Sequence, residues 1–163
     1  MSSGYLIVRW LHVLSGAAWF GLVAAIVFVI FPILSKLEGN RRKDLMAHIF
    51  PRIFRLATYL ISITLVAGGL LNYLLTGWRN LGMYFSSLRW FSLLLGALLG
   101  LGLGLFHFIV EPQLEFRIHS LVESSNEDQI ERVSRFLKVV PRVGFGILVL
   151  VILSMMVFAR GVG

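Results

Sequence analysis

Four long apolar runs dominate this sequence, and each is long enough to cross a lipid bilayer as a single helix. They cover about residues 5–35, 51–77, 86–113 and 139–160. The hydrocarbon core of a bilayer is about 30 Å thick and needs roughly 20 apolar residues in a helix to span it. We therefore expect an all-α, polytopic membrane protein whose four transmembrane helices form a bundle, with residues 1–163 making one membrane domain.

The composition supports this class. Hydrophobic residues make up 58% of the 163 residues and charged residues only 14%, whereas soluble domains have about 25% charged residues. The absence of cysteine excludes disulfides, thiolate metal sites and iron–sulfur clusters. The net charge of +7 does not indicate a nucleic-acid partner, because membrane proteins concentrate Lys and Arg in their cytoplasmic loops.

The positions of the basic residues predict the orientation. Those around the connections 36–50 and 114–138 outnumber those at the other end of the bundle by eleven to four. By the positive-inside rule, these two connections are cytoplasmic and both termini lie outside the cell. Within the longer connection, Ile130, Val133, Leu137 and Val140 recur at helical spacing. We expect an amphipathic cytoplasmic helix over about 126–140 that leads directly into the fourth span.

The two halves of the sequence are related by an internal repeat. A shift of 80 residues places Arg9-Trp10 on Arg89-Trp90, Gly16 on Gly96 and Pro32 on Pro112, and a shift of 90 residues places Pro51-Arg52 on Pro141-Arg142. Chance similarity between apolar helices would match leucines but not these residue types at fixed spacing. The repeat predicts a bundle of two duplicated helix hairpins with parallel topology and pseudo-two-fold symmetry about the membrane normal.

One face of the first span carries His12, Ser15, Gly16 and Trp19 at the spacing of a helix face. Polar groups inside a membrane are costly, so an intramembrane histidine is a functional-site hypothesis. Histidine is the commonest transition-metal ligand and holds the iron of b-type haems. His12 is therefore the first candidate ligand, although it could instead bond a neighbouring helix or water.

Two arginines at the same outer level as His12 suit the carboxylates of a haem. Arg9 and Arg89 could pair with haem propionates, because arginine matches carboxylate geometry. The alternative is that both side chains extend to lipid headgroups.

Two further histidines are candidate ligands. His107, in the third span, lies roughly 22 Å along the membrane normal from the level of His12, so one iron cannot bind both. Gly100 and Gly104 precede it and would let a flat cofactor approach the backbone, but glycines at this spacing, with Gly96, are also typical of close helix packing. His48 stands just before the second span and can share a haem with His107 only if that helix begins deeper.

Other polar residues carry weaker signals. His119 lies in polar sequence beyond the third span, where we expect it to be solvated. Glu111 is the only carboxylate within a span, which argues against an ion or proton pump.

The run Trp10-Leu11-His12-Val13-Leu14-Ser15-Gly16-Ala17-Ala18-Trp19-Phe20-Gly21 resembles the first-helix signature of the copper-resistance protein D-like integral membrane family. It is also similar to the opening of HemJ-type protoporphyrinogen oxidases. Residues 50–57 and 67–70 resemble the second helix of these families. The resemblance implies haem association, with His12 matching the first-helix histidine.

These features predict a membrane protein that binds haem b and transfers electrons across or at the membrane, with a redox protein or quinone as partner. One alternative is a non-enzymatic scaffold or accessory subunit in a homo-oligomer or larger membrane complex. It would bind partner helices through the glycine stripe formed by Gly96, Gly100 and Gly104. Another is metal transport of the copper-resistance D type. The sequence leaves open whether the protein is an enzyme.

Overall fold

The computed structural model describes residues 3–37, 39–78, 81–123 and 127–161, and all of its regular elements there are helical. The first helix, α1 (Ser3–Ala25), continues through the π-helical turn η1 (Ile26–Ile30) into α2 (Phe31–Leu34). Three long helices follow: α3 (Gly39–Thr76), α4 (Leu88–Glu123) and α5 (Glu127–Arg160). A short 3₁₀ helix, η2 (Leu81–Phe85), lies between α3 and α4.

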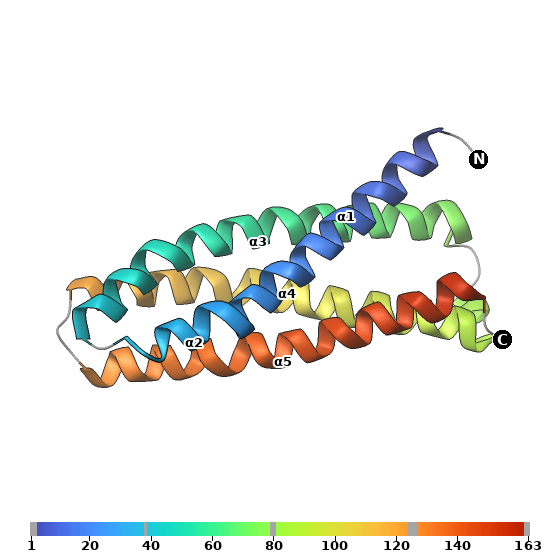
Figure 1. The fold of residues 1–163 in the computed structure, drawn as a ribbon. Coiled ribbons are helices and arrows are strands. Elements are labelled where there is room, and N and C mark those ends of the chain that lie inside the picture. Colours follow the sequence, from blue (N-terminus) through green and yellow to red (C-terminus); the bar gives the residue numbers. More distant parts are fainter. Residues whose placement is uncertain (1–2, 38, 79–80, 124–126, 162–163) are drawn as a thin grey trace.

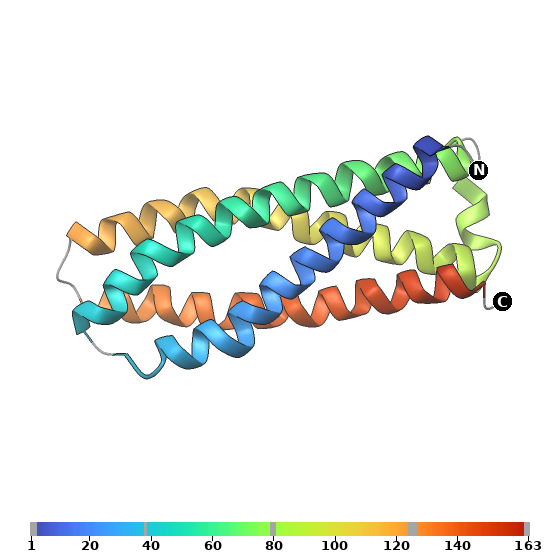
Figure 2. The same ribbon diagram turned by 45° about the horizontal axis from the view of Figure 1, so that its top comes forward.

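The helices form an elongated bundle (Figures 1 and 2). Helix α1 packs chiefly on α3 and α4 packs on α5, so each half of the chain makes one hairpin, and α3 packs on α4 to join them. Both termini lie at the same end of the bundle as η2 (Figure 1). The expected all-α bundle with four transmembrane helices is confirmed.

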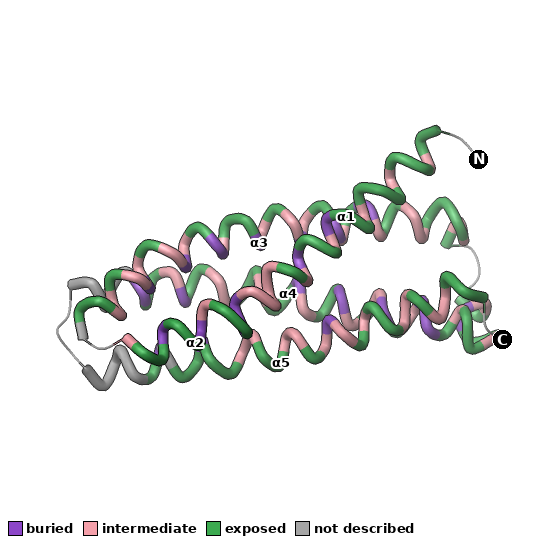
Figure 3. Tube along the Cα trace, viewed as in Figure 1, coloured by how far each residue is buried: buried purple, intermediate pink, exposed green. Residues whose placement is uncertain are grey.

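The outer surface is suited to lipid. Four segments are long and apolar enough to cross a membrane: Ser3–Leu34, Asn40–Thr76, Leu88–Ile118 and Arg135–Arg160. Large apolar side chains are exposed along them, including Trp10, Phe28, Val66 and Ile109, and Figure 3 shows exposed residues on the outer faces of every long helix. Soluble monomers rarely expose apolar patches of this extent, so the protein is a multi-pass membrane protein.

The helices continue beyond the predicted spans at the end opposite the termini. Pro51, Pro112 and Pro141 all lie inside helices, whereas the sequence indicated connections or helix starts near them. Membrane helices tolerate proline because neighbouring helices, hydroxyl side chains and water satisfy the freed carbonyls.

These extensions are packed together. Met46 on α3, Ile118 on α4 and Leu137 on α5 are each at most 2% exposed and belong to one apolar core that also contains Phe31 and Phe50. The side chains of His119 and Ile130 lie outside the described part of the chain.

The first helix changes its hydrogen bonding before Pro32. The N–H of Phe31 bonds the carbonyl of Ile26, a bond across five residues that defines the π turn. Proline has no N–H to offer the preceding turn, and π turns occur mostly as single turns inside α-helices. The side chains of Ile26 and Val27 are buried at this turn.

The two hairpins repeat one close contact. A Cβ placed on Gly16 would lie 3.5 Å from Cγ2 of Thr64, and a Cβ placed on Gly96 would lie 3.3 Å from Cβ of Ser154. The repeat shifts of 80 and 90 residues relate Gly16 to Gly96 and Thr64 to Ser154. Each hairpin is therefore closed by a glycine of its first helix against a small hydroxyl residue of its second.

Candidate functional site

His12 is held in the contact between α1 and α3. Its Nδ1 lies 2.9 Å from the carbonyl oxygen of Thr64. Because a carbonyl can only accept, Nδ1 donates this bond, and Nε2 is the lone-pair nitrogen of the neutral ring. A Cβ on Gly68 would lie 2.8 Å from Cε1 of His12, so the ring rests against a glycine of α3. The hydroxyl of Thr64 also donates to Ser15, at 2.8 Å.

A second polar group joins α3 to α4. Glu111 Oε2 lies 2.8 Å from His107 Nε2 and 2.6 Å from Thr58 Oγ1, while Thr58 Oγ1 lies 3.0 Å from the same imidazole nitrogen. An ionised carboxylate only accepts, so Nε2–H and the hydroxyl both donate to Glu111 and Nδ1 keeps a lone pair. Nothing in the described part of the chain hydrogen-bonds that Nδ1.

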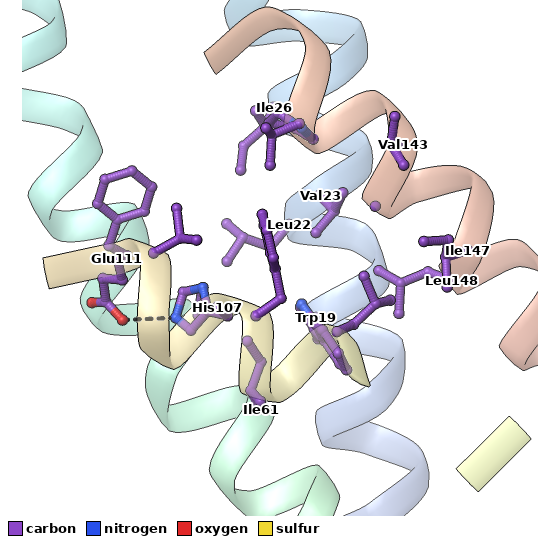
Figure 4. Close-up of a pocket in the computed structure, with 18 of the residues that line it drawn as sticks. Trp19, Leu22, Val23, Ile26, Ile61, His107, Glu111, Val143, Ile147 and Leu148 are labelled. Atoms are coloured by element: carbon purple, nitrogen blue, oxygen red, sulfur yellow. Dashed lines mark ion pairs between the residues drawn. The ribbon is translucent and has the colours of Figure 1, made fainter. Parts of the chain in front are cut away.

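His107 and Glu111 lie in the wall of a central cavity of about 500 Å³. All four long helices contribute to the wall, which is otherwise almost entirely apolar and includes Trp19, Leu22, Ile61 and Leu148. Figure 4 shows the imidazole among these side chains, with one ring nitrogen toward Glu111. The side chains of His107 and Glu111 are 17% and 15% exposed. The arrangement offers one acid–base pair to an otherwise apolar molecule.

Part of the cavity wall belongs to the outer surface of α4 and α5. Leu98 and Phe106 on α4, and Val139 and Val143 on α5, line the cavity and are also exposed on the surface of the bundle. In a bilayer this surface would face lipid chains, which places part of the cavity wall next to the membrane interior.

A smaller recess of about 220 Å³ lies on the other side of Glu111. Its lining consists of Pro51, Arg55, Thr58, Tyr59, Glu111 and Glu115. Glu111 lines both spaces and separates the apolar cavity from this polar recess.

The repeat-related positions carry no polar group. The shifts of 80 and 90 residues relate His107 to Val27, Glu111 to Phe31 and Thr58 to Leu148. These three side chains are buried and apolar. The polar group therefore exists at only one of the two related helix contacts.

The structure separates the ligands expected from the sequence. Trp19 and His107 line the central cavity, whereas His12 and His48 do not. The Nδ1 of His48 bonds the carbonyl of Asp44 at 2.7 Å on an exposed face of α3. Across the described ranges, no group of three or more His, Asp or Glu side chains could hold a metal ion.

The two arginines differ in their surroundings. Arg89 Nε donates to the carbonyl of Phe158, at 3.1 Å, near the end of α5, and its guanidinium lies 5.2 Å from the centre of the Phe158 ring. Arg9 is exposed near the free end of α1. The two side chains thus do not act as a matched pair.

Two of the three glycines in the α4 stripe are used inside the bundle. A Cβ on Gly104 would lie 2.6 Å from Leu65 Cδ1 of α3, and one on Gly96 would lie 2.8 Å from Met155 Cε of α5. A Cβ on Gly100 would meet nothing within 4 Å among the described atoms.

Sequence reasoning did not select Thr58 and Glu111 as site residues. Glu111 is four residues after His107, which places both side chains on one helix face, and this spacing was the available signal. Thr58 gives no such signal, because it joins the group only through the register of α3 against α4.

The sequence of the chain matches one known protein family. A family model described as a domain of unknown function (DUF4149) matches residues 14–116, and the chain belongs to this family. The matched range includes Thr58, His107 and Glu111 but not His12. No curated protein and no solved structure matches the chain.

Proposed function

We propose that this member of the DUF4149 family binds a lipid-soluble redox carrier of the quinone class in its central cavity and takes part in electron transfer in the membrane. The observation that carries the proposal is the His107–Glu111 pair in the wall of an apolar cavity of about 500 Å³. Ligand sites are typically apolar concavities with a few convergent polar groups. Lining residues of α4 and α5 are exposed on the apolar surface of the bundle, which suits a ligand that arrives through the bilayer.

The polar group suits the hydroxyl and carbonyl oxygens of such a carrier. Glu111 holds the proton on Nε2 of His107, so Nδ1 can accept a hydrogen bond and then the proton of a quinol hydroxyl. The Glu111 carboxylate stabilises the imidazolium that results, and Thr58 fixes the carboxylate by donating to it. When the carrier is reduced instead of oxidised, protonated Nδ1 donates to a quinone carbonyl. A separate redox protein would exchange the electrons.

Quinone binding by the purified protein tests the proposal. In lipid nanodiscs, a short-tailed ubiquinone analogue should quench tryptophan fluorescence saturably, because Trp19 lines the cavity, and Trp19→Phe should remove most of that signal. His107→Ala should weaken binding about tenfold, the effect of losing one hydrogen bond to a buried group. His48→Ala is the matched control, since His48 is exposed and outside the cavity. Equal binding by His107→Ala and the wild type would contradict the proposal.

A haem b site at His12 is a second candidate, and one contact favours it. The bond from Nδ1 to the Thr64 carbonyl leaves Nε2 free, and metal-bound histidines usually donate their other N–H in this way. His107 does not fit axial ligation through Nε2, since that nitrogen is bonded to Glu111 and Thr58. His12 would thus hold a haem that is five-coordinate, has a non-histidine sixth ligand or takes a ligand from another subunit.

A reduced-minus-oxidised spectrum after expression with added haem tests this second candidate. A Soret band that His12→Ala abolishes would support it, and the lack of any such band would exclude it. Metal analysis of the same two proteins tests transport of the copper-resistance D type. A stable larger complex with neither haem nor quinone would instead favour the scaffold role.

We also propose the orientation expected from the basic residues, with the connections 36–50 and 114–138 in the cytoplasm and both termini outside. The eleven-to-four distribution of Lys and Arg supports it. The His107–Glu111 pair would then lie toward the cytoplasmic side of the bilayer.

A further inference from the structure

The recess beside Glu111 combines charges of both signs at the edge of the membrane-facing surface. It has a volume of about 220 Å³ and lies between α3 and α4. We propose that it binds the zwitterionic headgroup of a phospholipid that carries a primary amine, of the phosphatidylethanolamine type. The ammonium would lie at the carboxylates of Glu111 and Glu115, and the phosphate at the guanidinium of Arg55.

The recess lies where the surface of α3 changes from apolar to charged. Ile63 and Val66 follow the recess along α3 and are exposed and apolar, while Arg52 and Arg55 are exposed at the level of the recess itself. Tyr59, which lines the recess and is 62% exposed, is of the residue type enriched at membrane interfaces. The recess is therefore at the level of the lipid headgroups, with apolar surface beside it for the acyl chains.

Two of the three charges in the recess, those of Glu115 and Arg55, are not neutralised within the part of the bundle that the structure describes. Glu111 and Glu115 are one turn apart on α4, where like charges repel. Glu111 is bonded to His107 and Thr58, but neither Glu115 nor Arg55 has an ion pair within the ranges that the structure describes. A ligand with one positive and one negative group satisfies both. A primary ammonium has three N–H donors for carboxylates, and the fork of arginine suits phosphate.

The same chemistry predicts a preference among lipids. A choline headgroup has no N–H to donate, and a glycerol headgroup brings no cation to the two carboxylates. Simple attraction to a chain of net charge +7 would give a different order, with the anionic lipid bound best. The headgroup preference therefore separates a specific site from general electrostatic binding.

Native mass spectrometry of the full chain in detergent, with equal amounts of palmitoyl-oleoyl phosphatidylethanolamine, phosphatidylcholine and phosphatidylglycerol, tests the site. We expect the ethanolamine lipid to be retained about tenfold more than either other lipid, the scale of hydrogen bonds to charged groups in a partly exposed site. Glu115→Gln and Arg55→Gln should each reduce that retention to the level of the choline lipid. Arg52→Gln is the matched control, because Arg52 is exposed on the same helix outside the recess.

Each contrary outcome overturns the proposal. Retention of the glycerol lipid above the ethanolamine lipid would show general electrostatic binding, and equal retention of all three would show that only acyl chains are held. Unchanged ethanolamine-lipid retention in Glu115→Gln and Arg55→Gln would place the lipid elsewhere. Helical circular dichroism of each variant confirms folding. Neither Arg55 nor Glu115 lines the central cavity, so quinone binding is measured separately from lipid retention and can fail without it.

Discussion

At the scale of single residues, α3 uses two threonines to fix two histidines of other helices. The carbonyl of Thr64 accepts from Nδ1 of His12, and the hydroxyl of Thr58 lies against Nε2 of His107. The nitrogen left for chemistry is consequently Nε2 at His12 and Nδ1 at His107. The two histidines thus differ in which atom is available, although both lie in helix–helix contacts.

Substitution at Gly68 tests how closely His12 is packed. A Cβ at this position would lie 2.8 Å from Cε1 of His12, whose ring is held by the bond to Thr64. We expect Gly68→Ala to lower the free energy of unfolding by about 1–3 kcal/mol, the usual cost of overpacking. Thermal unfolding in detergent measures the change.

The neighbouring glycine provides the control. A Cβ at Gly69 meets nothing within 4 Å among the described atoms, so Gly69→Ala should stabilise α3 by up to about 1 kcal/mol through its higher helix propensity. Equal midpoints for the two alanine variants would show that the ring of His12 is free to move.

At the scale of helices, the apolar runs located all four spans but not their full length. Hydropathy averages over every face of a helix, and the extensions of α3, α4 and α5 combine one buried stripe with many charged residues. Met46 and Leu137 are buried in a stripe of this kind. When hydropathy is averaged over all faces of the helix, such a segment has the value of a polar connection. The buried stripe becomes visible only once the facing helices are known.

The sequence also predicted only part of the candidate site. An intramembrane histidine pointed to His107, and helical spacing could have added Glu111. Thr58 and the cavity depend on how α3 and α4 are placed against each other, which no local pattern encodes. His12 drew the first attention as an intramembrane histidine on the polar face of the first span, yet that pattern alone does not distinguish a ligand from a packing contact.

At the scale of the whole molecule, the lack of native cysteine makes the orientation directly testable. Lys36, just after α2, and Ser86, just before α4, are exposed at opposite ends of the bundle. In intact cells, a membrane-impermeant maleimide should label Ser86→Cys at once and Lys36→Cys only after permeabilisation, because the positive-inside rule puts the second in the cytoplasm. The wild type, with no thiol, is the blank. The reverse labelling order would invert the proposed topology.

The polar group is present at only one of the two related helix contacts, so the two symmetry-related sides of the cavity differ chemically. His107 and Glu111 lie in the cavity wall with Thr58 bonded behind them, while Val27, Phe31 and Leu148 hold the related positions. A perfectly symmetric bundle would accept an elongated molecule equally well in two poses related by the dyad. If a quinone occupies the cavity as we propose, only one pose brings its polar head to the imidazole, so the divergence between the two halves would fix the orientation of the bound molecule.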